Sequence, residues 1–263
     1  MDYGIGGKQA LVTGSTEGIG WATARALAAE GVQVCINGRT QERVAEAVLR
    51  LRQAVGGSVQ GIAADLGTAA GCAALTAALP DVDILVNNLG IFEPRPFEAT
   101  SDEDWLRIFE VNVMSGIRLC RHYLPGMRQR GWGRIVFVSS ESGLQIPPEM
   151  IHYGVTKTAQ LALSRGLAET LPASGVTVNA VVPGPTATEG AVAFFEQLAK
   201  ERGCSAEAAQ RAFLAEHRPS SLLRRLATPD EVAAMIAYAC SMQAAATTGA
   251  ALRVDGGVVR SIT

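Results

Sequence analysis

Tyr153 and Lys157 stand four residues apart in the run YGVTK. On a helix, which we predict to begin near Met150, that spacing puts a phenol and an ammonium on one face. A free phenol has a pKa of about 10, so a tyrosine that exchanges protons near neutrality needs ~4 kcal/mol of help. One ammonium at ~5 Å supplies ~3 kcal/mol at an effective dielectric of ~20. The pair is therefore a candidate acid/base pair, although the same spacing is also common in ordinary surface pairs.

A glycine-rich turn follows the first apolar run of the chain. Residues 9–13 (QALVT) predict a strand, and a helical pattern covers 21–30. Glycines between them let the backbone come close to a ligand, and the free N–H groups at the helix start bind a phosphate. Such turns also occur without a ligand, and no Lys-Ser/Thr pair follows the last glycine, which excludes a P-loop. The candidate phosphate-binding residues are Gly14, Ser15, Thr16, Gly18, Ile19 and Gly20.

Strands and helices are expected to alternate along the rest of the chain. Further apolar runs predict strands at 32–37, 59–63, 82–87, 134–139, 176–181 and 251–254. Thr100 and Glu103 have the spacing of a capping box for a helix from about Ser101 that carries Asn112 in its interior. Alternation of this kind predicts an α/β fold with a doubly wound parallel sheet, in one domain over residues 1–263.

Polar residues stand directly after several of the predicted strands. A parallel sheet binds ligands outside the carboxyl ends of its strands, so these residues are expected to meet at one edge. They are the glycine-rich turn, Arg39, Asp65, Asn88, Ser140 and Thr186.

Composition excludes several classes of protein. The chain has 263 residues and a formal net charge of −2, which argues against a nucleic-acid-binding surface. The uncharged stretch after Glu231 contains too many polar residues for a membrane span. Five scattered cysteines with no Cys/His cluster predict reduced thiols, no metal site and a cytoplasmic location. The first residues show no secretory signal.

Together these motifs resemble the short-chain dehydrogenase/reductase family, over nearly the whole chain from Gly7 to Gly257. The markers are TGSTEGIG at 13–20, Asp65, NNLG at 87–90, Asn112, SSESG at 139–143, YGVTK at 153–157, VNAVVPG at 178–184 and VDGG at 254–257. The resemblance implies a Rossmann-like fold and hydride transfer between a nicotinamide cofactor and a ketone, aldehyde or alcohol.

The resemblance also implies a role for each site residue. Tyr153 is the expected acid/base, Lys157 its partner and a ribose ligand, and Ser140 the hydroxyl that binds the substrate oxygen. Asn112 is expected to bend its helix and anchor a proton-relaying water. The expected cofactor contacts are Asp65 and Leu66 at the adenine, Asn88 and Gly90 at the ribose, and Thr186 and Thr188 at the carboxamide and phosphates.

Residues after the second strand bear on the choice of cofactor. Members that bind NAD commonly place a carboxylate at that strand end, where it would repel a 2′-phosphate. Gly38 stands there instead, and the guanidinium of Arg39 can grip a phosphate through two charge-assisted hydrogen bonds. Glu17 on the neighbouring loop opposes this weakly. We therefore expect NADP(H) to be favoured over NAD(H). A further departure is Leu89, where the family usually has alanine.

The substrate is expected to contact the parts that the family does not share. These are residues 91–97, 141–150 and a segment of about 189–223, predicted as one or two helices over the cleft. Apolar residues of that segment either close over a substrate or pack it onto the body. A moderately apolar ketone or secondary alcohol is expected. Two alternatives stay open, an NAD-dependent dehydrogenase of a hydroxy acid or sugar and a non-catalytic NAD(P)-binding protein. A homotetramer is expected, with Gly116, Ala159 and Ala162 at positions of close approach.

Overall fold

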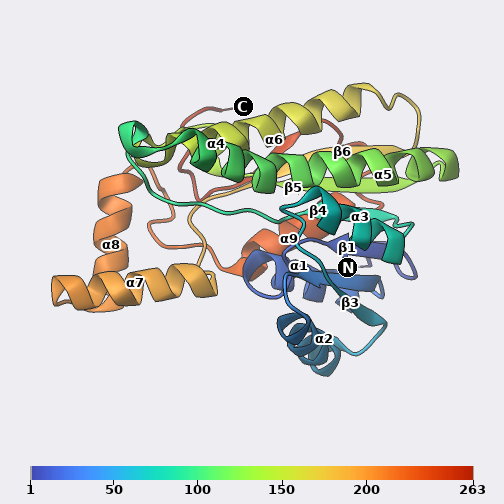
Figure 1. Cartoon of the computed structure of the whole chain (residues 1–263), viewed down its shortest axis with the longest axis horizontal. Helices are drawn as coiled ribbons and strands as arrows, with labels where there is room; N and C mark the ends of the chain where they lie inside the picture. The colour runs from blue at the N-terminus through green and yellow to red at the C-terminus, as the bar shows by residue number, and fades with distance from the viewer. Residues whose placement is uncertain (1, 263) are drawn as a thin grey trace.

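A parallel sheet of seven strands runs through the centre of the computed structural model, which describes residues 2–262 (Figure 1). The strand order is β3-β2-β1-β4-β5-β6-β7, the doubly wound order predicted from the alternation. Each predicted strand lies within two residues of an observed one. The strands are β1 (Gln9–Val12), β2 (Gln33–Gly38), β3 (Val59–Ala63), β4 (Ile84–Asn87), β5 (Gly133–Val138), β6 (Val176–Pro183) and β7 (Ala251–Val254).

Helices cover both faces of this sheet (Figure 1). One core packs α1, α2 and α9 onto the strands, and a second packs α3, α5 and α6 onto the opposite face. Because the central strands are buried on both faces, they read as continuous apolar runs. The helices are α1 (Gly18–Ala29), α2 (Gln41–Val55), α3 (Ala69–Ala78), α4 (Asp102–Phe109), α5 (Ser115–Arg130), α6 (Ile151–Glu169), α7 (Glu189–Arg202), α8 (Ala206–His217) and α9 (Pro229–Cys240).

The start of α4 corrects one local prediction. Ser101, not Thr100, is the N-cap, and its reciprocal partner is Asp104 rather than Glu103. The hydroxyl of Thr100 instead donates to the carbonyl of Pro96. Both pairs have the spacing of a capping box, and the shorter Asp side chain closes it equally well here.

The helix that carries Asn112 is interrupted, as the family resemblance implied. A π-helical segment, Glu110–Met114, separates α4 from α5. In such a segment each backbone hydrogen bond spans one more residue than in an α-helix, which interrupts the regular ladder. Asn112 lies in the middle of it and is buried.

The segment predicted over the cleft consists of two helices, α7 and α8, which project beyond one end of the sheet (Figure 1). They pack on each other through a small cluster around Phe195, Leu214 and Leu226. A bridge between Thr186 and Ala227 joins the two ends of this segment to the body. Phe195 of α7 and Phe213 of α8 thus pack between these helices, whereas Phe194 is exposed.

Among residues 2–262 no helix is long and apolar enough to cross a membrane. The uncharged stretch after Glu231 forms α9, a turn and β7, as predicted. Four of the five cysteines are buried thiols and Cys204 is exposed. The described residues contain no group of His, Cys, Asp and Glu side chains that could hold a metal ion.

Candidate active site

Tyr153 and Lys157 both lie on α6 beside the carboxyl end of β5. The ammonium Nζ of Lys157 is 5.5 Å from the centroid of the Tyr153 ring. It donates to the carbonyl of Val138 at 2.9 Å and to Oε1 of Gln160 at 3.1 Å. Lys157 is buried, so these two acceptors and the phenol ring define where its charge can act.

The pKa values of the pair differ from the simple two-charge argument. Burial lowers the pKa of Lys157 to about 8, and the Glu141 carboxylate opposes that shift. The pKa of Tyr153 is raised, first by burial and then by Glu141, while a hydrogen bond with Ser140 and the charge of Arg218 lower it. The prediction that Lys157 dominates the titration of the phenol was therefore incomplete, since it omitted the cost of burial. The free site keeps its proton on Tyr153.

Asn112 joins three parts of the site. Its Nδ2 donates to the carbonyl of Ile91 at 2.9 Å and to the hydroxyl of Thr156 at 3.0 Å, and its Oδ1 accepts from the Ile91 amide at 2.8 Å. The carbonyl of Asn112 accepts from Nε2 of Gln160 at 2.6 Å. Gln160 thus links the Lys157 ammonium directly to the π-helical segment. This link was missed in the sequence, and the predicted water stays a prediction.

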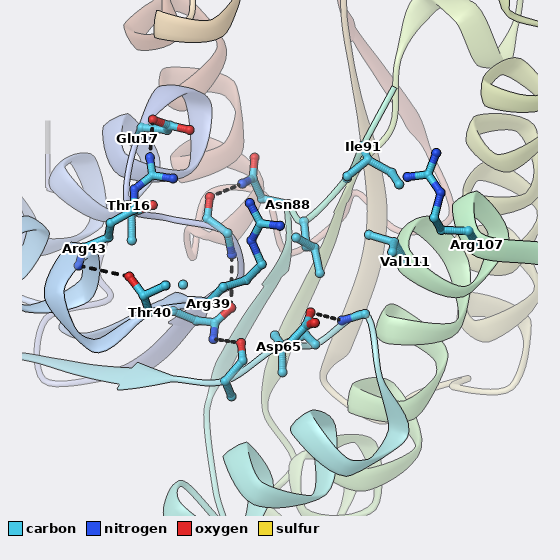
Figure 2. A pocket seen from close by; sticks show the side chains of 18 residues that line it. Thr16, Glu17, Arg39, Thr40, Arg43, Asp65, Asn88, Ile91, Arg107 and Val111 are labelled. Atoms are coloured by element: carbon cyan, nitrogen blue, oxygen red, sulfur yellow. Dashed lines mark hydrogen bonds and ion pairs between the residues drawn. The ribbon is translucent and has the colours of Figure 1, made fainter. Parts of the chain in front are cut away.

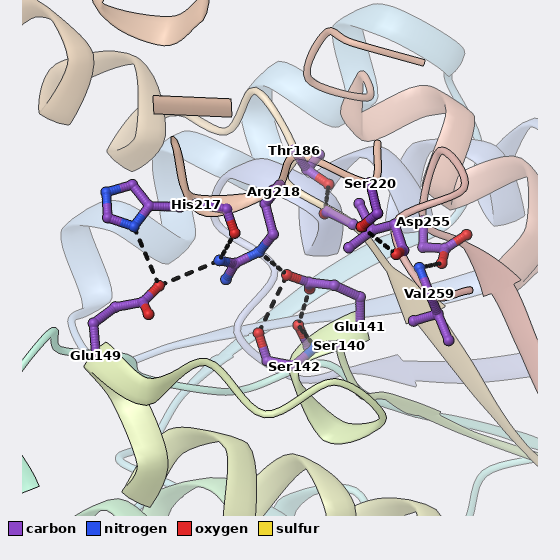
Figure 3. A network of polar contacts seen from close by, with 12 residues as sticks. Ser140, Glu141, Ser142, Glu149, Thr186, His217, Arg218, Ser220, Asp255 and Val259 are labelled. Carbon is purple, nitrogen blue, oxygen red and sulfur yellow. Dashed lines mark hydrogen bonds and ion pairs between the residues drawn. The ribbon is translucent and has the colours of Figure 1, made fainter. Parts of the chain in front are cut away.

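Ser140 follows β5 and its hydroxyl is tied to its neighbours (Figure 3). Its Oγ donates to Oε2 of Glu141 at 2.5 Å and accepts from the Ser142 amide at 3.1 Å. The other oxygen of Glu141 accepts from Nε of Arg218 at 2.8 Å. Arg218 comes directly after α8, so this ion pair connects the projecting helices to the serine.

Sequence reasoning missed Glu141 and Arg218 as individual site residues. It placed Glu141 only in a general substrate-contact segment, and Arg218 only within the predicted helices over the cleft. The available signal was a charged residue between two serines directly after a buried strand. Its buried arginine partner lies 77 residues further along the chain, so no local pattern could reveal the pair.

A cavity of about 690 Å³ lies at the carboxyl ends of β1 to β4 (Figure 2). Seven of the predicted cofactor residues line it, together with Glu17, Arg43, Leu89, Arg107 and Val111. The seven are Gly14, Thr16, Arg39, Asp65, Leu66, Asn88 and Gly90.

The backbone of this cavity is shaped for close approach. Gly14 has a φ of +58°, and an added Cβ would lie 3.2 Å from Cα of Leu89. A Cβ on Gly90 would lie 3.3 Å from Nζ of Lys157, so this glycine keeps the cavity open next to the ammonium. The Asn88 side chain donates to the carbonyls of Thr13 and Gly14 at 2.9 Å each, which fixes the turn. These features fit an extended nucleotide running from Arg39 toward Lys157.

The remaining predicted cofactor residues, Tyr153 and Lys157 among them, do not line this cavity. Ser15 is fully buried, and its hydroxyl donates to the Val12 carbonyl and accepts from the Asn37 amide. Its side chain thus holds β1 to β2, and its amide donates to the Asn37 carbonyl at 2.9 Å. A Cβ on Gly18 would lie 3.1 Å from Cγ2 of Thr188, which puts this threonine beside the start of α1. Ile19 and Gly20 form the first turn of α1, and Thr186 follows β6.

The charges around the end of the cavity that carries Arg39 favour an anion. Glu17 pairs with Arg43 at 2.6 Å, so its carboxylate is already compensated. Arg39 is exposed and extends over the cavity (Figure 2). Among residues 2–262, Arg39 makes no ion pair with a carboxylate.

Comparison with known proteins gives matches along the whole chain. A family model described as Enoyl-(Acyl carrier protein) reductase matches residues 14–259. The "Uncharacterized oxidoreductase YvaG" of Bacillus subtilis is 47% identical over 100% of both chains. The D-beta-hydroxybutyrate dehydrogenase of Cupriavidus necator is 34% identical over 97% of this chain and 99% of its own length. The crystal structure of L-sorbose reductase from Gluconobacter frateurii, complexed with NADPH and L-sorbose, superposes with a TM-score of 0.93 at 33% identity over 100% of both chains.

Proposed function

Because this chain belongs to the short-chain dehydrogenase/reductase family, we propose that it is an NADP(H)-dependent oxidoreductase that interconverts a ketone or aldehyde and an alcohol. The observation that carries this proposal is the group of Tyr153, Ser140, Lys157 and Asn112, which adjoins the cavity through its lining residues Gly90, next to Lys157, and Ile91, which is bound by Asn112. A non-catalytic protein has no need for a buried ammonium held beside a phenol and a serine.

The chemistry divides between the cofactor and the chain. The bound nicotinamide supplies or accepts a hydride. Tyr153 gives its proton to the oxygen of the substrate as negative charge develops there. The Ser140 hydroxyl, whose own proton goes to Glu141, accepts a hydrogen bond from Tyr153 or from the alcohol form of the substrate. Lys157 lowers the cost of the phenolate that remains, because its ammonium lies close to the ring in a buried site. Gln160 and Asn112 hold the ammonium in place.

A second candidate is a polyhydroxylated or hydroxy-acid substrate, such as a sugar. In the segment that we propose as the substrate lid, residues 189–223, the second helix ends at His217, and His217 and the following Arg218 face Glu141 and Glu149. These charged side chains suit a substrate with hydroxyl or carboxylate groups better than the apolar ketone expected from the sequence. Two similar proteins, an L-sorbose reductase and a D-beta-hydroxybutyrate dehydrogenase, are named for such substrates.

A panel of substrates tests the proposed function. Simple ketones, ketoses, 3-oxo acids and their alcohols are offered to the protein with NADPH, NADH, NADP⁺ and NAD⁺, and the nicotinamide absorbance is followed. We expect turnover of at least one class that Tyr153→Phe abolishes. No cofactor oxidation or reduction with any member of the panel would contradict the proposal.

Arg39 is predicted to set the cofactor preference. We expect kcat/KM with NADPH to exceed that with NADH by about tenfold, which corresponds to ~1.4 kcal/mol. Arg39→Ala removes the preference, because the 2′-phosphate loses its guanidinium. Arg211→Ala, an exposed arginine of α8, changes net charge equally and should leave the ratio unchanged. An Arg39→Ala ratio equal to the parent ratio would show that Arg39 binds something else.

The variant Gly38→Asp, which the sequence suggests for reversing the preference, is sterically unfavourable. A Cβ at Gly38 would lie 2.6 Å from Cγ2 of Thr16 and 3.1 Å from Cγ2 of Val44. Arg39→Asp places the carboxylate one residue later, on an exposed position of the same cavity. It is the better test of whether a negative charge there favours NADH.

A homotetramer, or failing that a dimer, is our proposal for assembly. Leu106, Phe109 and Val155 of α4 and α6 are exposed, which favours burial against another subunit. The prediction that Gly116 allows close approach of another subunit is wrong. A Cβ there would lie 2.9 Å from the Phe137 ring, so this glycine packs against its own chain. A light-scattering mass near 27.5 kDa at micromolar concentration would contradict the proposal.

The reduced, buried thiols fit our further proposal that the protein works in the cytoplasm.

A further inference from the structure

The hydroxyl of Ser140 has little freedom in this structure. A serine has one proton to donate and two lone pairs. The proton goes to Glu141 at 2.5 Å, and one lone pair accepts the Ser142 amide at 3.1 Å. The second lone pair is then left for the Tyr153 phenol or for a hydroxyl of the substrate.

The carboxylate that holds this proton is itself buried, with 4% of Glu141 exposed. A buried carboxylate is costly unless it is paired and hydrogen-bonded. Glu141 meets that condition through Arg218, which is 7% exposed and donates Nε at 2.8 Å, and through the Ser142 hydroxyl at 3.3 Å. The arginine in turn donates to Glu149 at 3.2 Å and to the His217 carbonyl at 2.8 Å (Figure 3).

We propose that Glu141 is a positioning residue whose carboxylate, held by Arg218 of the segment after α8, fixes the Ser140 hydroxyl in one orientation beside Tyr153. The two ends of the pair come from different parts of the chain. Glu141 follows β5, and Arg218 follows the second lid helix. The serine is therefore oriented when the lid is docked, and undocking the lid releases it. This inference rests on the proposed function for the roles of Ser140 and Tyr153.

The charges that face the phenol shift the pKa of Tyr153 in directions that can be measured. Lys157 faces Tyr153 from its own helix, Glu141 from the turn after β5 and Arg218 from the end of α8. Glu141 raises the pKa of Tyr153 and Arg218 lowers it. Glu149 and His217 lie one contact further away, around Arg218. Removing the charge of Glu141 should therefore lower the pKa of Tyr153, and removing the charge of Arg218 should raise it.

The test follows the appearance of tyrosinate by difference absorbance as pH is raised, in the NADP⁺ complex, with Tyr153→Phe as the blank. Glu141→Gln keeps the shape and removes the charge, so the midpoint should fall by about one pH unit. Arg218→Gln should raise the midpoint, and Arg218→Lys should stay near the parent value. Glu149→Gln is the matched control, because it also contacts Arg218 without touching Ser140. Its midpoint should not move.

Kinetics add a second readout. Glu141→Ala frees the Ser140 hydroxyl, so kcat should fall by about tenfold while KM for NADPH is unchanged, and Glu141→Asp should recover part of the loss. An unchanged midpoint in Glu141→Gln, or an equal shift in Glu149→Gln, would overturn the proposal. If Glu141→Gln does not fold, the two Arg218 variants decide the proposal. Equal midpoints in Arg218→Gln and Arg218→Lys would overturn it. The absorbance titration needs no substrate, so it stays valid even if the panel finds no turnover.

Discussion

Replacing Tyr153 by phenylalanine is expected to lower kcat by about a thousandfold, while the Kd for NADPH stays within about threefold of the parent value. Only a hydroxyl is lost, and the ring that packs edge-on against Phe92 remains. The effect is large because the raised pKa keeps the proton of the site on this phenol. Steady-state kinetics and a fluorescence titration of NADPH measure the two quantities.

Tyr123→Phe is the matched control for that variant. Tyr123 is buried, and its hydroxyl donates to the Leu79 carbonyl at 2.8 Å, away from the cavity. Its loss should lower stability by about 1 kcal/mol and leave kcat near the parent value. A Tyr153→Phe enzyme as active as Tyr123→Phe would remove Tyr153 from the mechanism.

Lys157→Met is expected to harm both turnover and cofactor binding. The methionine keeps the apolar stem, but the ammonium that contacts Val138, Gln160 and the phenol is lost. A loss of about two charge-assisted interactions predicts a fall in kcat/KM of about a hundredfold, with Kd for NADPH rising by about tenfold. Lys200→Met, at an exposed lysine of α7, is the control.

The two variants separate the two roles given to the pair. Tyr153→Phe should affect turnover alone, whereas Lys157→Met should affect turnover and cofactor affinity together. Equal cofactor affinity in the parent and Lys157→Met would mean that the ammonium does not reach the ribose. Because burial lowers the pKa of Lys157 to about 8, its charge is present below that pH and is lost above it. Cofactor affinity of the parent should weaken across that range, and the affinity of Lys157→Met should not.

The fold was predictable because its signals are local. Apolar runs of four to eight residues, glycine turns and helix caps recur in order, and a parallel sheet with both faces covered follows from their alternation. The error at the start of α4 arose because Thr100 and Ser101 both precede an acidic residue by three positions. Only the three-dimensional path of the chain before the helix decides between them.

The candidate site was predictable where it depends on residues close in sequence and not where it depends on burial. Gly14 and Asn88 come just after strands, and Tyr153 and Lys157 share one face of a helix. The pairing of Glu141 with Arg218 joins segments that are distant in the chain, so sequence spacing carries no information about it. Gly116 shows the same limit of sequence-based prediction. A small residue on a helix allows close packing either on the sheet of its own chain or on another subunit, and the sequence does not distinguish the two. The shift of the Tyr153 pKa required knowing that the phenol is removed from water.

The most direct test of hydride transfer to a carbonyl follows one deuterium atom. The protein is incubated with the best ketone of the panel and with NADPH deuterated at C4, prepared separately in each stereochemical form, and the product alcohol is analysed by mass spectrometry and NMR. We predict that one of the two forms delivers a single deuterium to the former carbonyl carbon, with a proton from solvent on its oxygen, and that Tyr153→Phe gives no product. Alcohol formed without deuterium from either form, or NADPH left unoxidised while alcohol appears, would contradict hydride transfer at this site.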